Sequence, residues 1–140
     1  MTQKEINLQR KAKRDHAVFM KRSLSAFHGI NRRVPHSIEI GTIRSIIKEY
    51  LGKPCRYCGE AITVDNFSLD HSLPLARGGS TSLDNIRVIC VKDNHAKGSL
   101  THFEFFVLMD LLKTFDRTGQ NDILSRLRLG GAAKARFGKK

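Results

Sequence analysis

Two five-residue segments decide the fold of this chain: Phe67-Ser68-Leu69-Asp70-His71 and Ile86-Arg87-Val88-Ile89-Cys90. The first contains an aromatic and an aliphatic residue at alternate positions and the second is rich in β-branched residues, which predicts two short β-strands. The polar stretch between them contains Pro74 and Gly78-Gly79, which favour a long loop. The sequence therefore predicts two strands joined by an extended connection.

Helices are expected after the second strand. Thr101-x-x-Glu104 is a capping box that opens a helix to about Phe115. We expect its apolar positions to supply much of the core: Phe105, Leu108, Met109 and Leu112. A short helix is expected near 122–129, and Gly130-Gly131 is expected to open a disordered tail.

Two further helices are expected before the first strand. Residues 4–27 are basic with scattered apolar positions, and a connector follows at Asn31-Arg32-Arg33-Val34-Pro35. Ser37 is the expected N-cap of a second helix that runs to about Leu51. Its apolar residues recur at helical spacing, at Ile40, Ile43, Ile47 and Tyr50/Leu51.

Positive charge is concentrated at the two ends of the chain. The 140 residues carry a net charge of +12, with 25 Lys and Arg against 13 Asp and Glu. Residues 1–33 contribute +7 and residues 126–140 contribute +6, whereas 34–125 carries −1. Two cationic flanks favour binding to a polyanion, of which nucleic acid is the commonest. A solubilising role or contact with an anionic membrane surface are the alternatives.

No apolar run approaches the ~18 residues that span a bilayer, so we expect no membrane segment. The first fifteen residues lack the apolar centre of a secretory signal, and an intracellular location is expected.

The three cysteines favour a metal site. An odd number of cysteines without a secretory signal argues against a disulfide framework. Cys55-x-x-Cys58 presents two thiolates on one turn, and Cys90-x-x-Asp93 repeats the two-residue gap with a carboxylate in the last place. A structural Zn²⁺ held by these four residues is chemically reasonable. Two alternatives remain open: His95 is the fourth ligand in place of Asp93, or the site is degenerate and binds no zinc.

A second set of donors lies between and beside these half-sites. Asp70 ends the first predicted strand and Asn94 follows the second, so their hard oxygen atoms are suited to Mg²⁺ or Mn²⁺. Because side chains alternate along a strand, His71 points away from Asp70 and can act on a water molecule instead.

These segments together strongly resemble the HNH endonuclease family, in its zinc-binding form. The resemblance covers roughly residues 37–115 and rests on the following stretches: Asp70-His71-Ser72-Leu73-Pro74-Leu75-Ala76-Arg77-Gly78-Gly79-Ser80, Asn85-Ile86, and Cys90-x-x-Asp93-Asn94-His95-Ala96-Lys97-Gly98, preceded by Cys55-x-x-Cys58. It implies the ββα-metal fold, in which two strands and a helix surround one catalytic divalent ion. The expected architecture is thus α+β: a small ββα-metal core with a zinc knuckle, flanked by helices and basic N- and C-terminal arms.

The resemblance also implies roles for individual residues. His71 matches the general base that activates water, and Asp70 and Asn94 match the ligands of the catalytic ion. Asn85 matches the residue that ties the long loop to the strand carrying the histidine. Asp93 departs from the family, because zinc-binding members usually have cysteine there.

The whole sequence then predicts three parts: a basic arm or helix (1–36), an HNH nuclease domain (37–115) and a short helix with a basic tail (116–140). The expected activity is hydrolysis of DNA phosphodiester bonds, with Arg77 and Lys97 as candidate phosphate contacts. One active site cuts one strand, so double-strand cleavage calls for a homodimer or two events. The alternative is a non-catalytic zinc-knuckle module that binds DNA or RNA.

Overall fold

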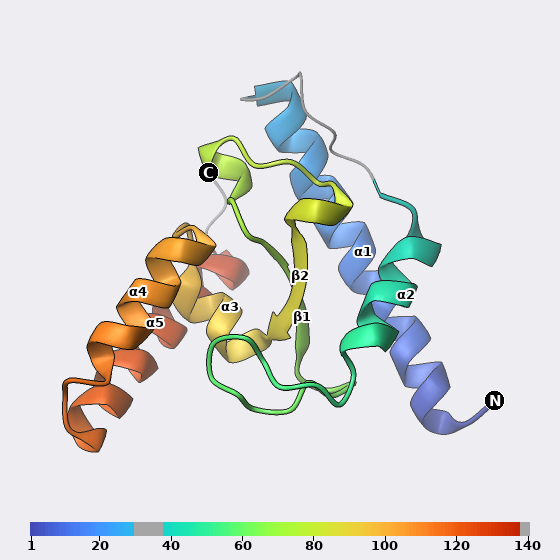
Figure 1. Ribbon diagram of the computed structural model, residues 1–140. Helices are drawn as coiled ribbons and strands as arrows, with labels where there is room; N and C mark the ends of the chain where they lie inside the picture. Colours follow the sequence, from blue (N-terminus) through green and yellow to red (C-terminus); the bar gives the residue numbers. More distant parts are fainter. Residues whose placement is uncertain (30–37, 138–140) are drawn as a thin grey trace.

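The computed structural model describes residues 1–29 and 38–137 as five α-helices, two short 3₁₀ turns and one small sheet (Figure 1). The elements in chain order are α1 (Gln3–Gly29), α2 (Ile40–Tyr50), β1 (Phe67–His71), η1 (Leu75–Arg77), η2 (Leu83–Asn85), β2 (Ile86–Cys90), α3 (Val91–Lys97), α4 (His102–Leu112) and α5 (Arg117–Phe137). This α+β architecture confirms the expected fold class.

The sheet is one antiparallel pair, in which Phe67 lies opposite Cys90 and Asp70 lies opposite Arg87. Both strands have the predicted bounds. The long loop between them contains η1 and η2, and α3 begins immediately after β2. A strand, a loop, a second strand and a short helix are the elements of a ββα unit.

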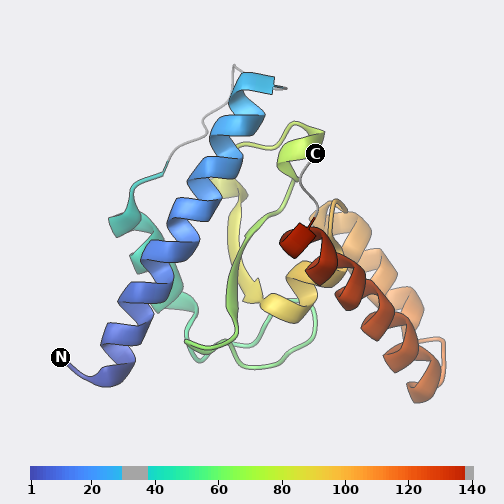
Figure 2. The same ribbon diagram turned by 180° about the vertical axis from the view of Figure 1, so that it is seen from behind.

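The helices cover the hairpin from two sides. Figures 1 and 2 show α1 and α2 beside the strands on one side, and α3, α4 and α5 on the other. The largest cluster of buried residues joins the hairpin to α1 and α2 and includes Ile43, Ile47, Phe67 and Ile89. Burial of such large apolar side chains is the main stabilising contribution to a domain of this size.

The hairpin therefore has two differently used faces. Phe67 and His71 contact α1: the Lys11 ammonium lies 3.7 Å from the centre of the Phe67 ring, and Phe19 stacks on His71. Ser68 and Asp70, at the alternate positions, contact side chains of α3. Neighbouring residues of β1 therefore contact different helices: one face of the strand lies against α1 and the other against α3.

Several predicted helices are observed and two expectations are wrong. The capping box of Thr101 and Glu104 is present at the start of α4. In contrast, α5 continues to Phe137, through Gly130 and Gly131, where we expected a short helix and then a disordered tail. Ser37 and the connector at 31–35 lie outside the described residues, and Glu39 precedes α2 without a side-chain cap.

The second wrong expectation concerns α4. Phe105 and Leu112 are buried, but Leu108 and Met109 are only half-buried. Its other large apolar residues, Phe103, Phe106 and Leu111, are exposed, because α4 packs along one side only. Within the described residues, no helix is long and apolar enough to span a membrane.

Candidate metal centres and catalytic residues

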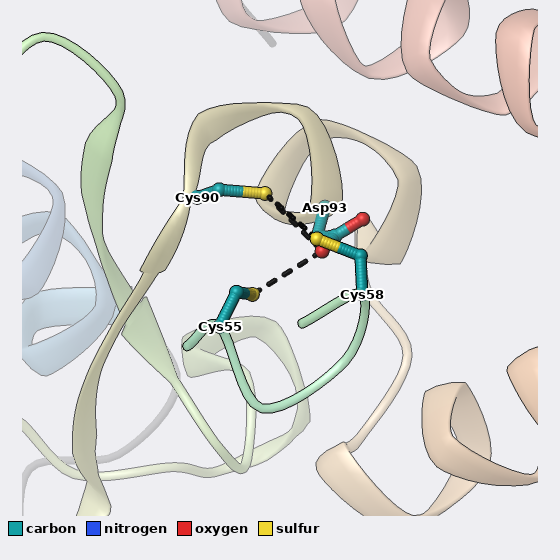
Figure 3. A group of neighbouring side chains, drawn as sticks. All are labelled: Cys55, Cys58, Cys90 and Asp93. Atoms are coloured by element: carbon teal, nitrogen blue, oxygen red, sulfur yellow. Dashed lines mark hydrogen bonds between the residues drawn. The ribbon is translucent and has the colours of Figure 1, made fainter. Parts of the chain in front are cut away.

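The four candidate zinc ligands converge on one point. Cys55 and Cys58 come from the turn after α2, Cys90 ends β2, and Asp93 lies in the first turn of α3 (Figure 3). Their ligand atoms all lie within 4.8 Å of one another. Asp93 Oδ2 is 3.2 Å from the Sγ atoms of both Cys55 and Cys90, and Cys58 Sγ is 3.7 Å from Cys90 Sγ.

These separations suit a tetrahedral ion. Bonds of about 2.3 Å to sulfur and about 2.0 Å to oxygen place neighbouring ligand atoms roughly 3.5 Å apart. The cluster contains Asp93 and not His95. Among the described residues, the structure therefore favours Asp93 as the fourth ligand. Three thiols and one carboxylate form a donor set that zinc accepts.

Two thiols of this cluster have raised pKa values and so hold protons that a metal would displace. Burial raises the pKa of the Cys58 thiol to about 12. The hydrogen bond between Cys55 and Cys90 raises the pKa of Cys90 well above its ordinary value and lowers the pKa of Cys55 to about 6. Metal binding here is therefore linked to proton release.

Asp70 is a buried carboxylate whose two oxygens have different surroundings. Oδ1 accepts a hydrogen bond from the Lys97 ammonium at 3.1 Å, and both side chains are almost fully buried. Oδ2 is buried and has no hydrogen-bond partner among the described residues. Burial raises the pKa of Asp70, and the opposing effect of Lys97 is smaller. An unsatisfied buried carboxylate oxygen is a suitable ligand for a hard divalent cation.

Asn94 lies on the same face of α3 as Lys97, three residues earlier. Its Nδ2 donates to Ser68 Oγ at 2.6 Å and to the Leu69 carbonyl at 3.2 Å. Since Ser68 and Asp70 share one face of β1, the helix presents Asn94 and Lys97 to that face together. Both bonds use the amide nitrogen, whereas an amide binds cations through its oxygen. Asp70 and Asn94 therefore lie at the same face of the hairpin, and each carries an oxygen of the type that a hard divalent cation binds.

His71 is on the opposite face of β1 and is half-buried. Its ring stacks on the Phe19 ring with centroids 4.3 Å apart and an interplanar angle of 8°. Its Nε2 lies 3.0 Å from the hydroxyl oxygen of Thr81, a fully buried residue of the loop. Its backbone carbonyl accepts a hydrogen bond from the Lys97 ammonium at 2.9 Å. The imidazole is thus held by two separate segments of the chain, and the backbone of His71 is held by a third.

Asn85 fastens the loop between the strands. Its Oδ1 accepts from the Leu73 amide at 2.9 Å, and its Nδ2 donates to the carbonyls of Leu73 and Ser80 at 3.0 and 2.7 Å. Gly79 allows the same loop to close, because a Cβ there would lie 1.8 Å from the Leu73 carbonyl oxygen. The loop thereby fixes where β1 ends and where His71 lies.

The two candidate phosphate contacts differ in accessibility. Arg77 is exposed and forms an ion pair with Glu104 at the start of α4. Lys97 has 1% exposure and its ammonium is engaged by Asp70. The structure therefore places Lys97 in the interior, contrary to the surface contact expected from the sequence, because α3 turns it towards β1.

Sequence reasoning missed Phe19, Thr81 and the role of Lys97. Helical spacing could have identified Phe19, because it shares the buried side of α1 with Leu8 and Ala12. Thr81 carried no such signal, because only the closed loop brings it to His71.

The arrangement of hairpin, loop, helix and donors is that of a class of nucleases. Residues 55–105 match the family model described as HNH endonuclease, which confirms the resemblance seen in the sequence. A 46-residue stretch, 32% of this chain, is 41% identical to a CRISPR-associated endonuclease Cas9 of Corynebacterium diphtheriae. The match spans 4% of the length of that relative. Both comparisons support a nuclease domain.

Proposed function

We propose that this protein is a metal-dependent endonuclease that hydrolyses DNA phosphodiester bonds. The observation that carries the proposal is the carboxylate of Asp70: it is buried, beside His71 in sequence, and has one oxygen held by Lys97 and the other without a partner among the described residues. A structural acid would use both oxygens in hydrogen bonds.

Each residue of the site has a defined part in this proposal. Asp70 and Asn94 would hold a divalent ion such as Mg²⁺ or Mn²⁺, which would supply Lewis-acid stabilisation of charge on the scissile phosphate. His71 accepts the proton of the attacking water, and its stacking on Phe19 and its contact with Thr81 limit the orientations of the imidazole. Asn85 positions His71 by closing the loop. Arg77 is the exposed cation that we assign to the DNA backbone.

The cluster of Cys55, Cys58, Cys90 and Asp93 is proposed to bind Zn²⁺ as a structural ion. It joins the turn after α2 to the end of β2 and the start of α3. Bound there, zinc would hold α3, and with it Asn94 and Lys97, against the hairpin.

A plasmid-nicking assay with Mg²⁺ or Mn²⁺ tests the activity. The wild-type chain is expected to convert supercoiled DNA to the open circle, and His71→Ala is expected to lose this activity. His16→Ala is a matched control, because His16 is also half-buried and its Nε2 donates to the backbone carbonyl of Ile38. Equal nicking by the wild type and His71→Ala would overturn the proposal.

The second candidate function is a non-catalytic module that binds nucleic acid through the zinc knuckle and the basic flanks. Binding of the plasmid without any nicking, whether Mg²⁺ or Mn²⁺ is supplied, would favour this function. The same plasmid, used in a gel-shift experiment, separates the two functions.

A further inference from the structure

Helix α5, which lies outside the segment matched to the nuclease family, reaches the zinc cluster. Arg128 Nη2 is 3.5 Å from Asp93 Oδ1, and Asp93 has 0% exposure. The other oxygen of the same carboxylate, Oδ2, faces the sulfur atoms of Cys55 and Cys90. The two oxygens of Asp93 are therefore divided between the metal cluster and a cation from α5.

We propose that Arg128 is a positioning residue for the zinc ligand Asp93. By engaging Oδ1, the guanidinium directs Oδ2 towards the thiols and fixes which oxygen binds the ion. Outer contacts of this kind orient ligands and tune metal affinity. This inference rests on the zinc site proposed above.

Charge supplies a second reason for a cation at this place. Three thiolates and one carboxylate carry more negative charge than one Zn²⁺ neutralises, and a buried excess charge is costly. Arg128 offsets part of that excess. Its Nε atom is buried and has no hydrogen-bond partner among the described residues, whereas 30% of the side chain is exposed, so the guanidinium reaches the buried carboxylate from the edge of the solvent.

Close contact between α5 and α3 brings Arg128 to the cluster. A Cβ added to Gly131 would lie 1.9 Å from the carbonyl oxygen of His95, so the two helix backbones meet at that point. Gly131 follows Arg128 by three residues and shares its side of α5. A Cβ added to Gly130, in contrast, would meet no atom of another element within 4 Å. The glycine pair that the sequence favoured as the start of a tail thus contains a specific helix contact.

The test measures the zinc affinity of the full chain by competition with a chromogenic chelator. Arg128→Met is expected to weaken zinc binding by about 10- to 100-fold, as loss of an outer-shell partner does. Arg128→Lys, which keeps the charge, is expected to recover part of the loss. Arg126→Met is the matched control and is expected to stay within about twofold, because Arg126 pairs with Asp122 on the exposed side of the same helix.

A double substitution separates positioning from simple helix docking. In an Asp93→Cys background no carboxylate remains to be positioned, and the loss of zinc affinity caused by Arg128→Met is then expected to shrink to the part that charge compensation supplies. A purely structural role would give the same loss in both backgrounds. Co²⁺ absorption provides an independent signature, since a displaced carboxylate changes the visible bands of a tetrahedral thiolate site.

The outcomes distinguish this inference from the zinc proposal itself. Unchanged zinc affinity in Arg128→Met, with a wild type that binds one ion, would overturn the role of Arg128 alone. A wild type that binds no zinc would overturn both. Gly131→Ala is expected to weaken zinc binding and Gly130→Ala is not, so equal behaviour of this pair would also contradict the inference.

Discussion

The ring of Phe19, in the N-terminal helix, lies flat on the imidazole of His71, with centroids 4.3 Å apart. The basic N-terminal segment is thus more than a cationic arm, because it forms one wall of the candidate catalytic site. Lys11, on the same helix, donates to the Phe67 carbonyl at 2.7 Å and is likewise used inside the fold.

Phe19→Ala is expected to destabilise the protein and impair nicking together. Truncation of a buried phenylalanine costs about 3–5 kcal/mol of unfolding free energy, and Phe19 is buried. Val18→Ala, at an exposed neighbouring position, is the control. Chemical denaturation measures the difference, and a loss below about 1 kcal/mol for Phe19→Ala would contradict the observed stacking.

Lys97→Met is expected to be strongly destabilising, by about 3–5 kcal/mol, because it leaves Asp70 buried without its cation. The double variant Lys97→Met with Asp70→Asn removes both charges and is expected to recover much of that loss. Lys92→Met changes an exposed lysine of the same helix and serves as the control. Thermal or denaturant unfolding checks all three, and an additive double variant would argue against a coupled pair.

Zinc binding is expected to release about two protons per ion at pH 7.5. Burial raises the pKa of Cys58 and the hydrogen bond with Cys55 raises that of Cys90, so both thiols are expected to lose a proton to the ion, whereas the pKa of Cys55 is lowered. Calorimetry in buffers of different ionisation enthalpy counts these protons. Zinc binding without proton release would show that other groups hold the ion.

The pKa of His102 is expected to lie below 6.5, because burial disfavours the charged ring and Arg56, Lys97 and Arg87 repel it. Arg56 can only donate, so the bond at 3.0 Å makes His102 Nε2 an acceptor and leaves Nδ1 to donate to the Tyr57 hydroxyl at 2.9 Å. Protonation of Nε2 would place its proton against the Arg56 donor and break that bond.

A lowered pKa in the folded state fixes the sign of the pH effect. The contribution of His102 to stability is complete above pH 6.5 and is lost as the pH falls through the folded pKa. An NMR titration of the imidazole measures this pKa directly. His102→Gln is expected to reduce the acid sensitivity of unfolding, and a folded pKa above 6.5 would reverse the expectation.

Affinity for duplex DNA is expected to fall steeply with salt, since the two flanks hold fifteen Lys and Arg residues. A slope of log affinity against log salt steeper than about −3 corresponds to more than three phosphate contacts. Fluorescence anisotropy between about 50 and 200 mM salt measures it. A flat dependence would contradict a role for the flanks in binding.

The sequence predicted both strands residue by residue, because their apolar composition and the flanking loop signals agree. It also predicted, through the repeated two-residue gap, the four residues that cluster at the candidate metal site. What it could not supply was the contribution of distant helices. Phe19 and Arg128 reach their partners only by tertiary contact, and the exposure of Phe103 and Phe106 depends on how α4 lies on its neighbours.

The glycines illustrate the same limit. Gly130-Gly131 has the composition of a chain end, and local propensity favours a break there. The helix persists because α5 lies against α3, where Gly131 permits a backbone approach that any side chain would block. Tertiary contact overrides the local preference.

The reach of α1 and α5 into the central motif has a practical consequence for protein engineering. A fragment trimmed to residues 55–105 would keep every matched family position and discard the partners of His71 and Asp93 from either end. Grafting such a fragment into a host protein would require the host to provide an aromatic wall and a guanidinium of its own. The unit to transplant is therefore the span from α1 to α5, and the segment that matches the family model is only its central part.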